Sequence, residues 1–246
     1  MRIAICGELV VDTGTSIVRE SAFPGRLGRR LWTYLVLQRR RPVGREELIT
    51  ALWGDESPEA ADASLNPLVS RVRSAVGDPA SGIELRASSG TYGLRLPDDA
   101  FVDRERAWTA INHVQALQRE GRARDAWAEA IVANEIAARG FLAGEDAPWI
   151  EGERRTLRGI ELQALDALCE AELAQHRALE AERAARRLIA LDPLRESGYR
   201  HLMRAAADAG NAAHAAAIMD ECRAALASVS ARPSAATERV YREVVG

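Results

Sequence analysis

The chain has 246 residues, 47% of them hydrophobic and 28% charged, which are ordinary proportions for a globular protein with one large domain or two smaller ones. Apolar runs fall short of the ~18 residues that a membrane span needs, and the first residues read as a strand, so we expect neither a membrane protein nor a signal peptide. The net charge is −3, with +2 over residues 1–97 and −5 over residues 98–246, and the chain contains no lysine. The three cysteines lie far apart and outside any C-x-x-C motif, so we expect reduced thiols in a cytoplasmic protein.

The first 97 residues predict strands, then three short helices, then a β-hairpin. Residues 2–11 and 17–20 have the β-branched character of strands. Apolar residues then recur at helical spacing in three segments, 29–39, 42–55 and 64–77. Residues 83–97 alternate polar and apolar side chains around a Ser-Ser-Gly turn, which is typical of a hairpin. This order of elements is that of a winged helix-turn-helix domain.

Seven arginines and no acidic residue lie between Arg26 and Arg45. Such a density of arginine favours a surface that faces phosphates. An ordinary solvated surface explains the same run equally well, so the charge pattern leaves both interpretations open. From this run we assign Arg29 and Arg30 to DNA binding.

The helix expected at 64–77 divides into an apolar stripe and a polar face. Six apolar residues share one side of the helix: Leu65, Leu68, Val69, Val72, Ala75 and Val76. The other side carries small polar residues and is flanked by two arginines: Asn66, Pro67, Ser70 and Ser74, with Arg71 and Arg73 at the edges. Small central residues let a helix enter a major groove, where guanidinium groups reach guanine edges or phosphates and Asn66 pairs with adenine. A plain surface helix is the alternative, but the basic run before it and the hairpin after it favour a DNA-reading helix.

Pro67 is unusual at this place. Inside a helix, proline removes one backbone hydrogen bond and clashes with the preceding turn, at a cost of about 3 kcal/mol. Either Asn66 caps a helix that starts at Pro67, or a longer helix from about Glu59 bends there. The sequence leaves both arrangements open.

From about residue 98 onward the strand patterns end and alanine-rich helical patterns follow. A short motif recurs as GRARDA (121–126), HRALEA (176–181) and GNAAHA (210–215), and the last two copies are 34 residues apart, the period of tetratricopeptide repeats. We therefore expect an all-α, tetratricopeptide-like second domain. The expected fold class is mainly α with a small β part, a winged helix-turn-helix domain followed by a helical domain.

Motifs of catalysis, nucleotide binding and metal binding are missing from the sequence. It contains no G-x-x-x-x-G-K-[ST], G-x-G-x-x-G, H-E-x-x-H or G-x-S-x-G, and its four histidines lack the spacing of metal ligands. We expect a protein that is not an enzyme, with no catalytic residue, no cofactor and no metal site.

Several motifs, in order, resemble the Streptomyces antibiotic regulatory protein family. VSRVR at 69–73 is similar to the family's V-S-R-L-R helix signature, and GTYGLRL at 90–96 resembles its Gly-Tyr wing strand. Three further segments resemble the family's bacterial transcriptional activator domain, 148–157, 188–216 and 232–245. The resemblance implies an OmpR-type winged-helix DNA-binding domain over 1–97 and a bacterial transcriptional activator domain over 98–246. It also adds Thr91 and Tyr92 of the wing to the expected DNA contacts.

The resemblance implies a transcription activator that binds direct repeats in double-stranded DNA, associates with further copies there and recruits RNA polymerase. In OmpR-type folds the loop between the second and third helices touches polymerase. Here that loop is 54–60, and its acidic residues Asp55, Glu56 and Glu59 suit a basic σ-factor region, although a solvated acidic loop is an equal alternative. The sequence lacks the ATPase and sensor modules of larger relatives, so nucleotide control is not expected.

Two other functions stay open. The helical repeats could bind a partner protein while the winged helix has weakened or lost DNA binding, which Pro67 and the low net charge of the first half favour. The helical half could also sense a small molecule in a pocket near Trp127 and Trp149, although tryptophans more often anchor a core.

Overall fold

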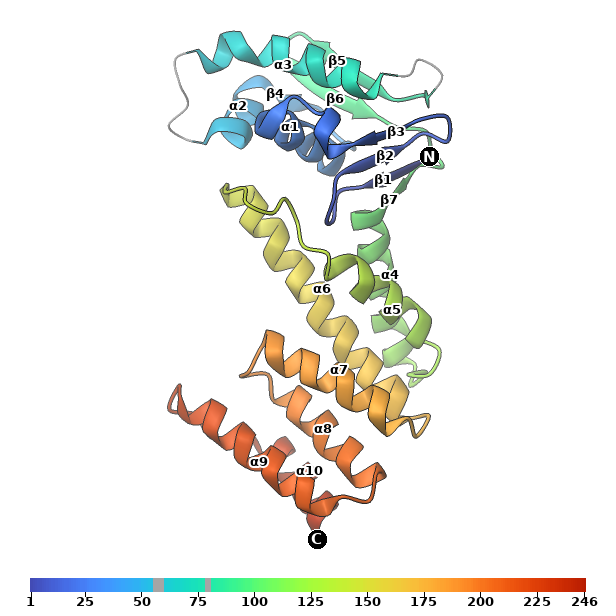
Figure 1. Cartoon of the computed structure of the whole chain (residues 1–246), viewed down its shortest axis with the longest axis vertical. Helices are drawn as coiled ribbons and strands as arrows, with labels where there is room; N and C mark the ends of the chain where they lie inside the picture. The colour runs from blue at the N-terminus through green and yellow to red at the C-terminus, as the bar shows by residue number, and fades with distance from the viewer. Residues whose placement is uncertain (55–59, 78–80) are drawn as a thin grey trace. The chain divides into compact units, whose positions relative to one another are not determined.

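The computed structural model describes residues 1–54, 60–77 and 81–246 (Figure 1). It forms two compact units, which consist of residues 1–106 with 139–156 (unit 1) and residues 107–138 with 157–246 (unit 2). Each unit therefore combines two separate stretches of chain, whereas the sequence predicted two consecutive domains. Within the described ranges, no helix combines the length and the apolar character that crossing a membrane requires.

Unit 1 contains two small sheets. The first has the strand order β3-β2-β1-β7, in which β1 runs antiparallel to β2 and parallel to β7. Its strands are β1 (Arg2–Ala4), β2 (Val10–Asp12), β3 (Ile17–Arg19) and β7 (Phe101–Val102). The second sheet has the order β4-β6-β5, all antiparallel, with strands β4 (Val43–Gly44), β5 (Glu84–Ser88) and β6 (Thr91–Arg95).

The hairpin predicted at 83–97 is confirmed. β5 and β6 pair in register up to Ser88 opposite Thr91, so Ser89 and Gly90 form a two-residue turn. Both turn residues have positive φ, 49° and 75°. A type I′ turn requires positive φ at both positions, and it matches the natural twist of two antiparallel strands.

Three helices form the core of unit 1 with the second sheet. They are α1 (Gly25–Leu37), α2 (Arg45–Trp53) and α3 (Ala61–Val76), and a short 3₁₀ turn, η1 (Glu20–Ala22), precedes them. α1 packs against α2, α3 and β6. Each helix contributes completely buried apolar residues: Leu31, Trp32 and Leu35 of α1, Leu48 and Leu52 of α2, and Leu65 of α3. Three helices followed by a hairpin confirm the predicted winged helix.

The segment 139–156 completes unit 1. Trp149 meets the rings of Tyr34 and Phe141 edge-on, with centroid distances of 5.1 and 6.0 Å. Its indole N–H donates a hydrogen bond of 2.8 Å to the carbonyl of Ala51, near the end of α2. The last carbonyls of a helix have no partner within the helix, so this contact satisfies one of them.

Unit 2 is all α. Its helices are α4 (Asp103–Arg119), α5 (Trp127–Ala137), α6 (Pro148–Leu173), α7 (Ala178–Leu191), α8 (Glu196–Asp208), α9 (Ala212–Ala227) and α10 (Ala235–Val245), of which α4 and α6 begin in unit 1. Consecutive helices from α7 to α10 pack against each other, and α10 also packs against α8. Their shared core centres on Tyr199, Leu202, Met203, Ile218 and Met219.

The recurring sequence motif marks the turns between these helices. Gly121, His176 and Gly210 all have positive φ, between 55° and 72°. In each turn this residue donates its N–H to the carbonyl three residues earlier, and the next residue donates to the carbonyl five residues earlier. This pair of bonds defines a Schellman turn, which ends one helix and directs the chain into the next. Ser230 forms a fourth such turn before α10. These turns explain why the short motif recurs, and the helical domain predicted from it is confirmed.

Candidate nucleic-acid interface

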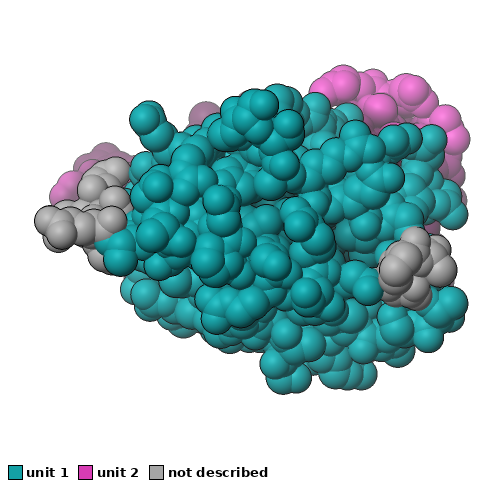
Figure 2. Space-filling view, turned by 90° about the horizontal axis from the view of Figure 1, so that it is seen from above, with its two compact units in different colours: residues 1–106, 139–156 teal, residues 107–138, 157–246 magenta. Residues whose placement is uncertain are grey.

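α3 presents the polar face that the sequence predicts. The apolar stripe is buried apart from Ala75, which is half-buried. The residues of the other face are exposed: Asn66, Pro67, Ser70, Arg71, Arg73 and Ser74. Figure 2 shows the surface of unit 1 in teal from above, the side on which α3 lies in Figure 1. The helix therefore buries one side in the core of unit 1 and leaves the other side available.

Pro67 lies inside a continuous helix. α3 begins at Ala61 and runs through Pro67 to Val76, so the arrangement in which Asn66 caps a helix starting at Pro67 is wrong. The longer helix is the observed one, although Glu59, where we expected it to begin, lies outside the described residues. Because proline has no N–H, the carbonyl of Ala63 receives no hydrogen bond from position 67.

The two arginines of α3 have different surroundings. Arg73 donates from Nε to the carbonyl of Leu85 in β5 at 3.0 Å, which ties the end of α3 to the hairpin. Arg71 is exposed, and no hydrogen bond or ion pair joins it to any residue that the structure describes. Ser74 donates to the carbonyl of Ser70 one turn earlier, at 3.1 Å. Among the described residues, Arg71 is thus the arginine of this face that has no hydrogen-bonded or ionic partner.

A hydrogen-bonded network surrounds Asn66. The Tyr92 hydroxyl donates to Asn66 Oδ1 at 2.8 Å, and Arg45 Nη1 donates to the Tyr92 hydroxyl at 2.7 Å. Arg45 also donates from Nε to the Asp62 carboxylate at 2.6 Å, and this bond holds the pKa of Asp62 below its usual value. Tyr92 is buried, so the prediction that it contacts DNA is corrected: its ring packs inside unit 1 and its hydroxyl holds Asn66. Sequence analysis did not single out Arg45, although it lies in the basic run.

Thr91 lies at the exposed tip of the hairpin. Its hydroxyl donates to the carbonyl of Ser88 across the turn at 2.8 Å. Both residues are exposed, as are Ser89 and Gly90 between them. The predicted contact residue Thr91 therefore occupies a position from which a partner can be reached.

Arg30 does not lie on the surface. Its side chain is 5% exposed, and Nε donates to the equally buried carboxylate of Glu145 at 2.7 Å. Its other nitrogens donate to the carbonyls of Leu52 and Asp146. The prediction that Arg30 binds DNA is therefore corrected, because its guanidinium is buried and each of its three nitrogens donates a hydrogen bond inside unit 1.

Arg29 shares the same carboxylate. It lies 3.0 Å from Glu145 and 3.3 Å from Glu20, and its side chain is about a quarter exposed. Arg26 approaches Glu145 as well, at 3.6 Å. Glu145 was missed by the sequence reading, since nothing links it to α1 before the chain is folded.

The rest of the basic run is also paired. Arg39 makes two hydrogen bonds to Glu105, Arg40 lies 3.5 Å from the same carboxylate, and Arg41 binds Glu47. The ion pairs to carboxylates elsewhere in unit 1 thus reach all seven arginines between 26 and 45. The run therefore offers much less unpaired positive charge to DNA phosphates than its sequence indicates.

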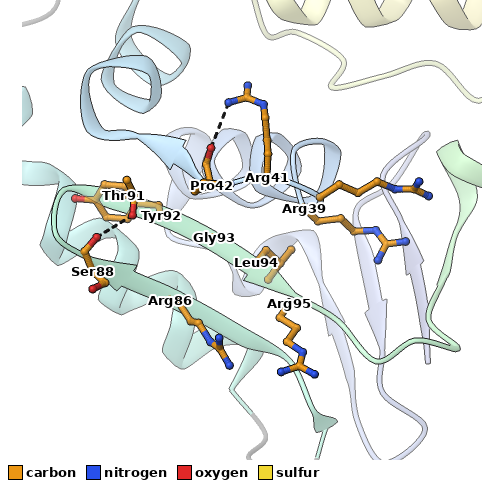
Figure 3. A pocket seen from close by; sticks show the side chains of 11 residues that line it. Arg39, Arg41, Pro42, Arg86, Ser88, Thr91, Tyr92, Gly93, Leu94 and Arg95 are labelled. Carbon is orange, nitrogen blue, oxygen red and sulfur yellow. Dashed lines mark hydrogen bonds between the residues drawn. The ribbon is translucent and has the colours of Figure 1, made fainter.

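A basic groove of about 370 Å³ lies between the turn at 39–42 and the β5–β6 hairpin (Figure 3). Arg86 and Arg95 project from the two strands on one side, and Arg39 and Arg41 come from the opposite side. None of the residues that line the groove is acidic. Arg86 pairs with Glu84, whereas Arg95 contacts no partner within residues 1–54, 60–77 and 81–246. The alternation of Leu85 with Arg86 and of Leu94 with Arg95 is the sequence signal that could have located these arginines.

The predicted polymerase-contact residues Asp55, Glu56 and Glu59 lie outside the described residues. The two tryptophans near which the sequence left a small-molecule pocket open belong to different units, Trp127 to unit 2 and Trp149 to unit 1. The Trp127 indole donates to Glu172 at 2.6 Å, and that of Trp149 donates to Ala51.

Comparisons with known proteins agree with these elements. Residues 102–245 match the family described as "Bacterial transcriptional activator domain", and residues 26–90 match "Transcriptional regulatory protein, C terminal". The chain is a member of the Streptomyces antibiotic regulatory protein family. This membership confirms the resemblance found in the sequence.

Several relatives share parts of the family architecture. The regulatory protein AfsR of Streptomyces coelicolor is 32% identical over 81% of this chain and 20% of its own length, and AfsR of Streptomyces griseus is 29% identical over 98% and 24%. The transcriptional regulatory protein EmbR of Mycobacterium bovis is 40% identical over 29% of this chain and 19% of its own length. The family member described here therefore spans about a fifth to a quarter of the length of the AfsR proteins.

A solved structure has the same fold. Mycobacterium tuberculosis EmbR, in complex with a low-affinity phosphopeptide, matches with a TM-score of 0.83 over 99% of this chain and 64% of that chain, at 24% identity. The likeness confirms the fold class of a winged helix followed by a helical domain.

Proposed function

We propose that this family member is a sequence-specific, DNA-binding transcription activator that works by binding, without a catalytic step. α3 enters the major groove with its exposed face, and the hairpin tip at 88–91 meets the adjoining backbone. The observation that carries the proposal is the combination, on one exposed helix face, of small residues at the centre and the unengaged Arg71 at the edge. Such a face fits the width of a major groove.

Positive charge next to this face supports the proposal. Arg71 on α3 and Arg95 in the groove of Figure 3 have no carboxylate partner among the described residues, so both are available to phosphates. Phosphate contacts release counterions, and affinity then falls steeply as salt rises. Selecting DNA sites from a randomised duplex pool, and titrating the selected site against a scrambled one at several salt concentrations, tests the proposal. Binding that ignores both sequence and salt would contradict it.

Polymerase recruitment is the second part of the proposal. Residues 54–60 come after α2 in the sequence, and the acidic residues among them, Asp55, Glu56 and Glu59, suit a basic region of a σ factor. Replacing the three acids by alanine should lower promoter-dependent transcription in vitro while DNA affinity stays unchanged. Loss of DNA affinity in this variant would count against a polymerase role for the loop.

Self-association on direct repeats is the third part. One winged helix reads only a few base pairs, so useful specificity needs two copies. Direct repeats place both recognition helices on one face of DNA when their centres lie about one helical turn, ~10–11 bp, apart. Inserting about 5 bp between the repeats should abolish cooperative binding, because one copy then faces the opposite side.

A protein-interaction module with weakened DNA binding is the competing function. The pairing of all seven arginines between 26 and 45 favours it, since this removes much of the basic surface expected from the sequence. The same salt titration separates the two functions: an interaction module selects no DNA site.

A further inference from the structure

The hydrogen bonds around Asn66 define which end of its amide faces a partner. Asn66 is exposed on α3, and its Oδ1 accepts from the Tyr92 hydroxyl at 2.8 Å and from Arg45 Nη1 at 3.4 Å. A carbonyl oxygen has two lone pairs, and both are directed at these donors. The Nδ2 amino group donates to no other residue within the part of the chain that the structure describes. The amide thus turns its acceptor inward and its donors outward.

The direction of this amide follows from Arg45. A guanidinium can only donate, so the Tyr92 hydroxyl accepts from Arg45 and donates its own O–H to Asn66 Oδ1. Turning the Asn66 amide by 180° would set its amino group against the N–H of Arg45. It would also leave the buried proton of Tyr92 without an acceptor, which is costly in a low-dielectric site.

Arg45 is itself held in place by Asp62. Its Nε donates to the Asp62 carboxylate at 2.6 Å, and Nη2 donates to the Asp62 carbonyl at 2.7 Å. Arg45 is thus the donor at the centre of the network: it donates to Asp62 on the first turn of α3 and to Tyr92, which in turn donates to Asn66 on the next turn of the same helix.

We propose that Asn66 is a donor-only reader that prefers guanine over adenine at one position of the DNA site; this inference rests on the proposed function. An asparagine reads adenine by accepting from N6 and donating to N7, and both atoms of the amide are needed. Here the acceptor is already used. Guanine offers two acceptors, N7 and O6, to the outward amino group, whereas adenine offers N7 and a donor that meets no acceptor. The sequence alone favours adenine, so the network changes the expected base.

Tyr92 and Arg45 are positioning residues in this account, because they act through Asn66. Tyr92→Phe removes the hydroxyl that holds the amide and lets it turn its oxygen outward. The ring is retained, so the packing of unit 1 is kept. The matched control is Tyr34→Phe. It also removes a tyrosine hydroxyl from unit 1, but this hydroxyl donates to the Glu47 carboxylate and not to Asn66.

The test compares base preferences by site selection with the full chain and with three variants, Asn66→Ala, Tyr92→Phe and Tyr34→Phe. The position at which Asn66→Ala loses its preference identifies the contacted base. At that position the wild type should bind guanine about tenfold or more tightly than adenine, and 7-deazaguanine should weaken binding. In Tyr92→Phe this ratio should fall towards one, and in Tyr34→Phe it should stay at the wild-type value.

Three results would overturn the inference while leaving DNA binding intact. They are a wild-type preference for adenine at the Asn66 position, an unchanged ratio in Tyr92→Phe, and an equal loss of affinity for all sequences in Asn66→Ala. Failure of the wild type to select any DNA site would instead overturn the proposed function, and the inference with it.

Discussion

Unit 1 contains two sets of arginines that look alike in the sequence and have different surroundings in the folded chain. Every arginine between Arg26 and Arg45 lies within 3.6 Å of a carboxylate oxygen. Arg71 on α3 has no such partner among the described residues. The number of arginines in a stretch of sequence therefore does not give the unpaired positive charge on the surface, since carboxylates such as Glu145 and Glu105 reach them from distant segments.

Glu145 illustrates the paired set. It lies 115 residues after Arg30, and only 2% of its side chain is exposed. A buried guanidinium needs a carboxylate and further acceptors, and Arg30 finds them in Glu145 and in the carbonyls of Leu52 and Asp146. This cluster fixes segment 139–156 to the winged helix.

Glu145→Gln should give the largest effect, because it leaves the charge of Arg30 buried without compensation. We expect the free energy of unfolding to fall by about 3–5 kcal/mol, measured by chemical denaturation. The control is Glu84→Gln, which breaks an exposed pair with Arg86 and should cost below about 1 kcal/mol. Equal losses of unfolding free energy in the two variants would contradict the expectation that buried arginine pairs matter more for stability than exposed ones.

Pro67→Ala tests the cost that α3 carries on its exposed face. The variant regains an N–H that can donate to the carbonyl of Ala63, so stability should rise, by at most about 3 kcal/mol. Thermal or chemical unfolding measures the gain, and Ser70→Ala on the same face serves as the control with little change. A loss of stability in Pro67→Ala would mean that the proline ring makes contacts that outweigh the missing hydrogen bond.

Arg71→Ala and Arg26→Ala compare the unpaired Arg71 with Arg26, which is paired with a carboxylate. Arg71→Ala should weaken binding to a selected DNA site by about 1–3 kcal/mol if it contacts a base, and the discrimination between sites should fall with it. Arg26 is also exposed, with 63% of its side chain accessible, yet it lies 3.6 Å from Glu145, so Arg26→Ala should change DNA affinity little. Similar effects of both variants, measured by fluorescence anisotropy, would contradict the assignment.

The Arg41–Glu47 pair should make a small, pH-dependent contribution to the stability of the folded chain. Hydrogen bonds from Arg41 lower the pKa of Glu47 from 4.5 to about 2. A depressed carboxylate pKa stabilises the folded state above pH 4.5, and this stabilisation is lost as pH falls from 4.5 towards 2. Because the pair is partly exposed, we expect less than about 1 kcal/mol. In Glu47→Gln the loss of stability over this pH range should be smaller than in the wild type; an unchanged pH profile would exclude the pair as its source.

Local patterns were sufficient for much of the fold. Helical spacing located the buried stripe of α3 from Leu65 to Val76, and the Ser-Ser-Gly sequence located the hairpin turn. Both features depend on residues close in the chain, where periodicity and turn chemistry act directly. The exposed positions of Ser70 and Arg71 followed from the same spacing.

Features that depend on residues far apart in the chain could not be predicted from the sequence. Arg30 was expected at the surface because Glu145 cannot be linked to it from the sequence, and Tyr92 was expected at DNA because its bond to Asn66 joins β6 to α3. The inclusion of segment 139–156 in unit 1 is of the same kind. Burial of a charged or polar side chain is decided by its partner, and a single sequence does not name that partner.

A titration at several salt concentrations determines whether the exposed face of α3 reads DNA. Affinity for a selected site and for a scrambled duplex would be measured at several salt concentrations, with wild type and Arg71→Ala. We expect the wild type to bind the selected site at least about a thousandfold more tightly than the scrambled duplex, with log affinity falling linearly with log salt. Arg71→Ala should reduce this preference or the slope. Equal affinity for both duplexes, with a slope that Arg71→Ala leaves unchanged, would contradict a DNA-reading role for this face.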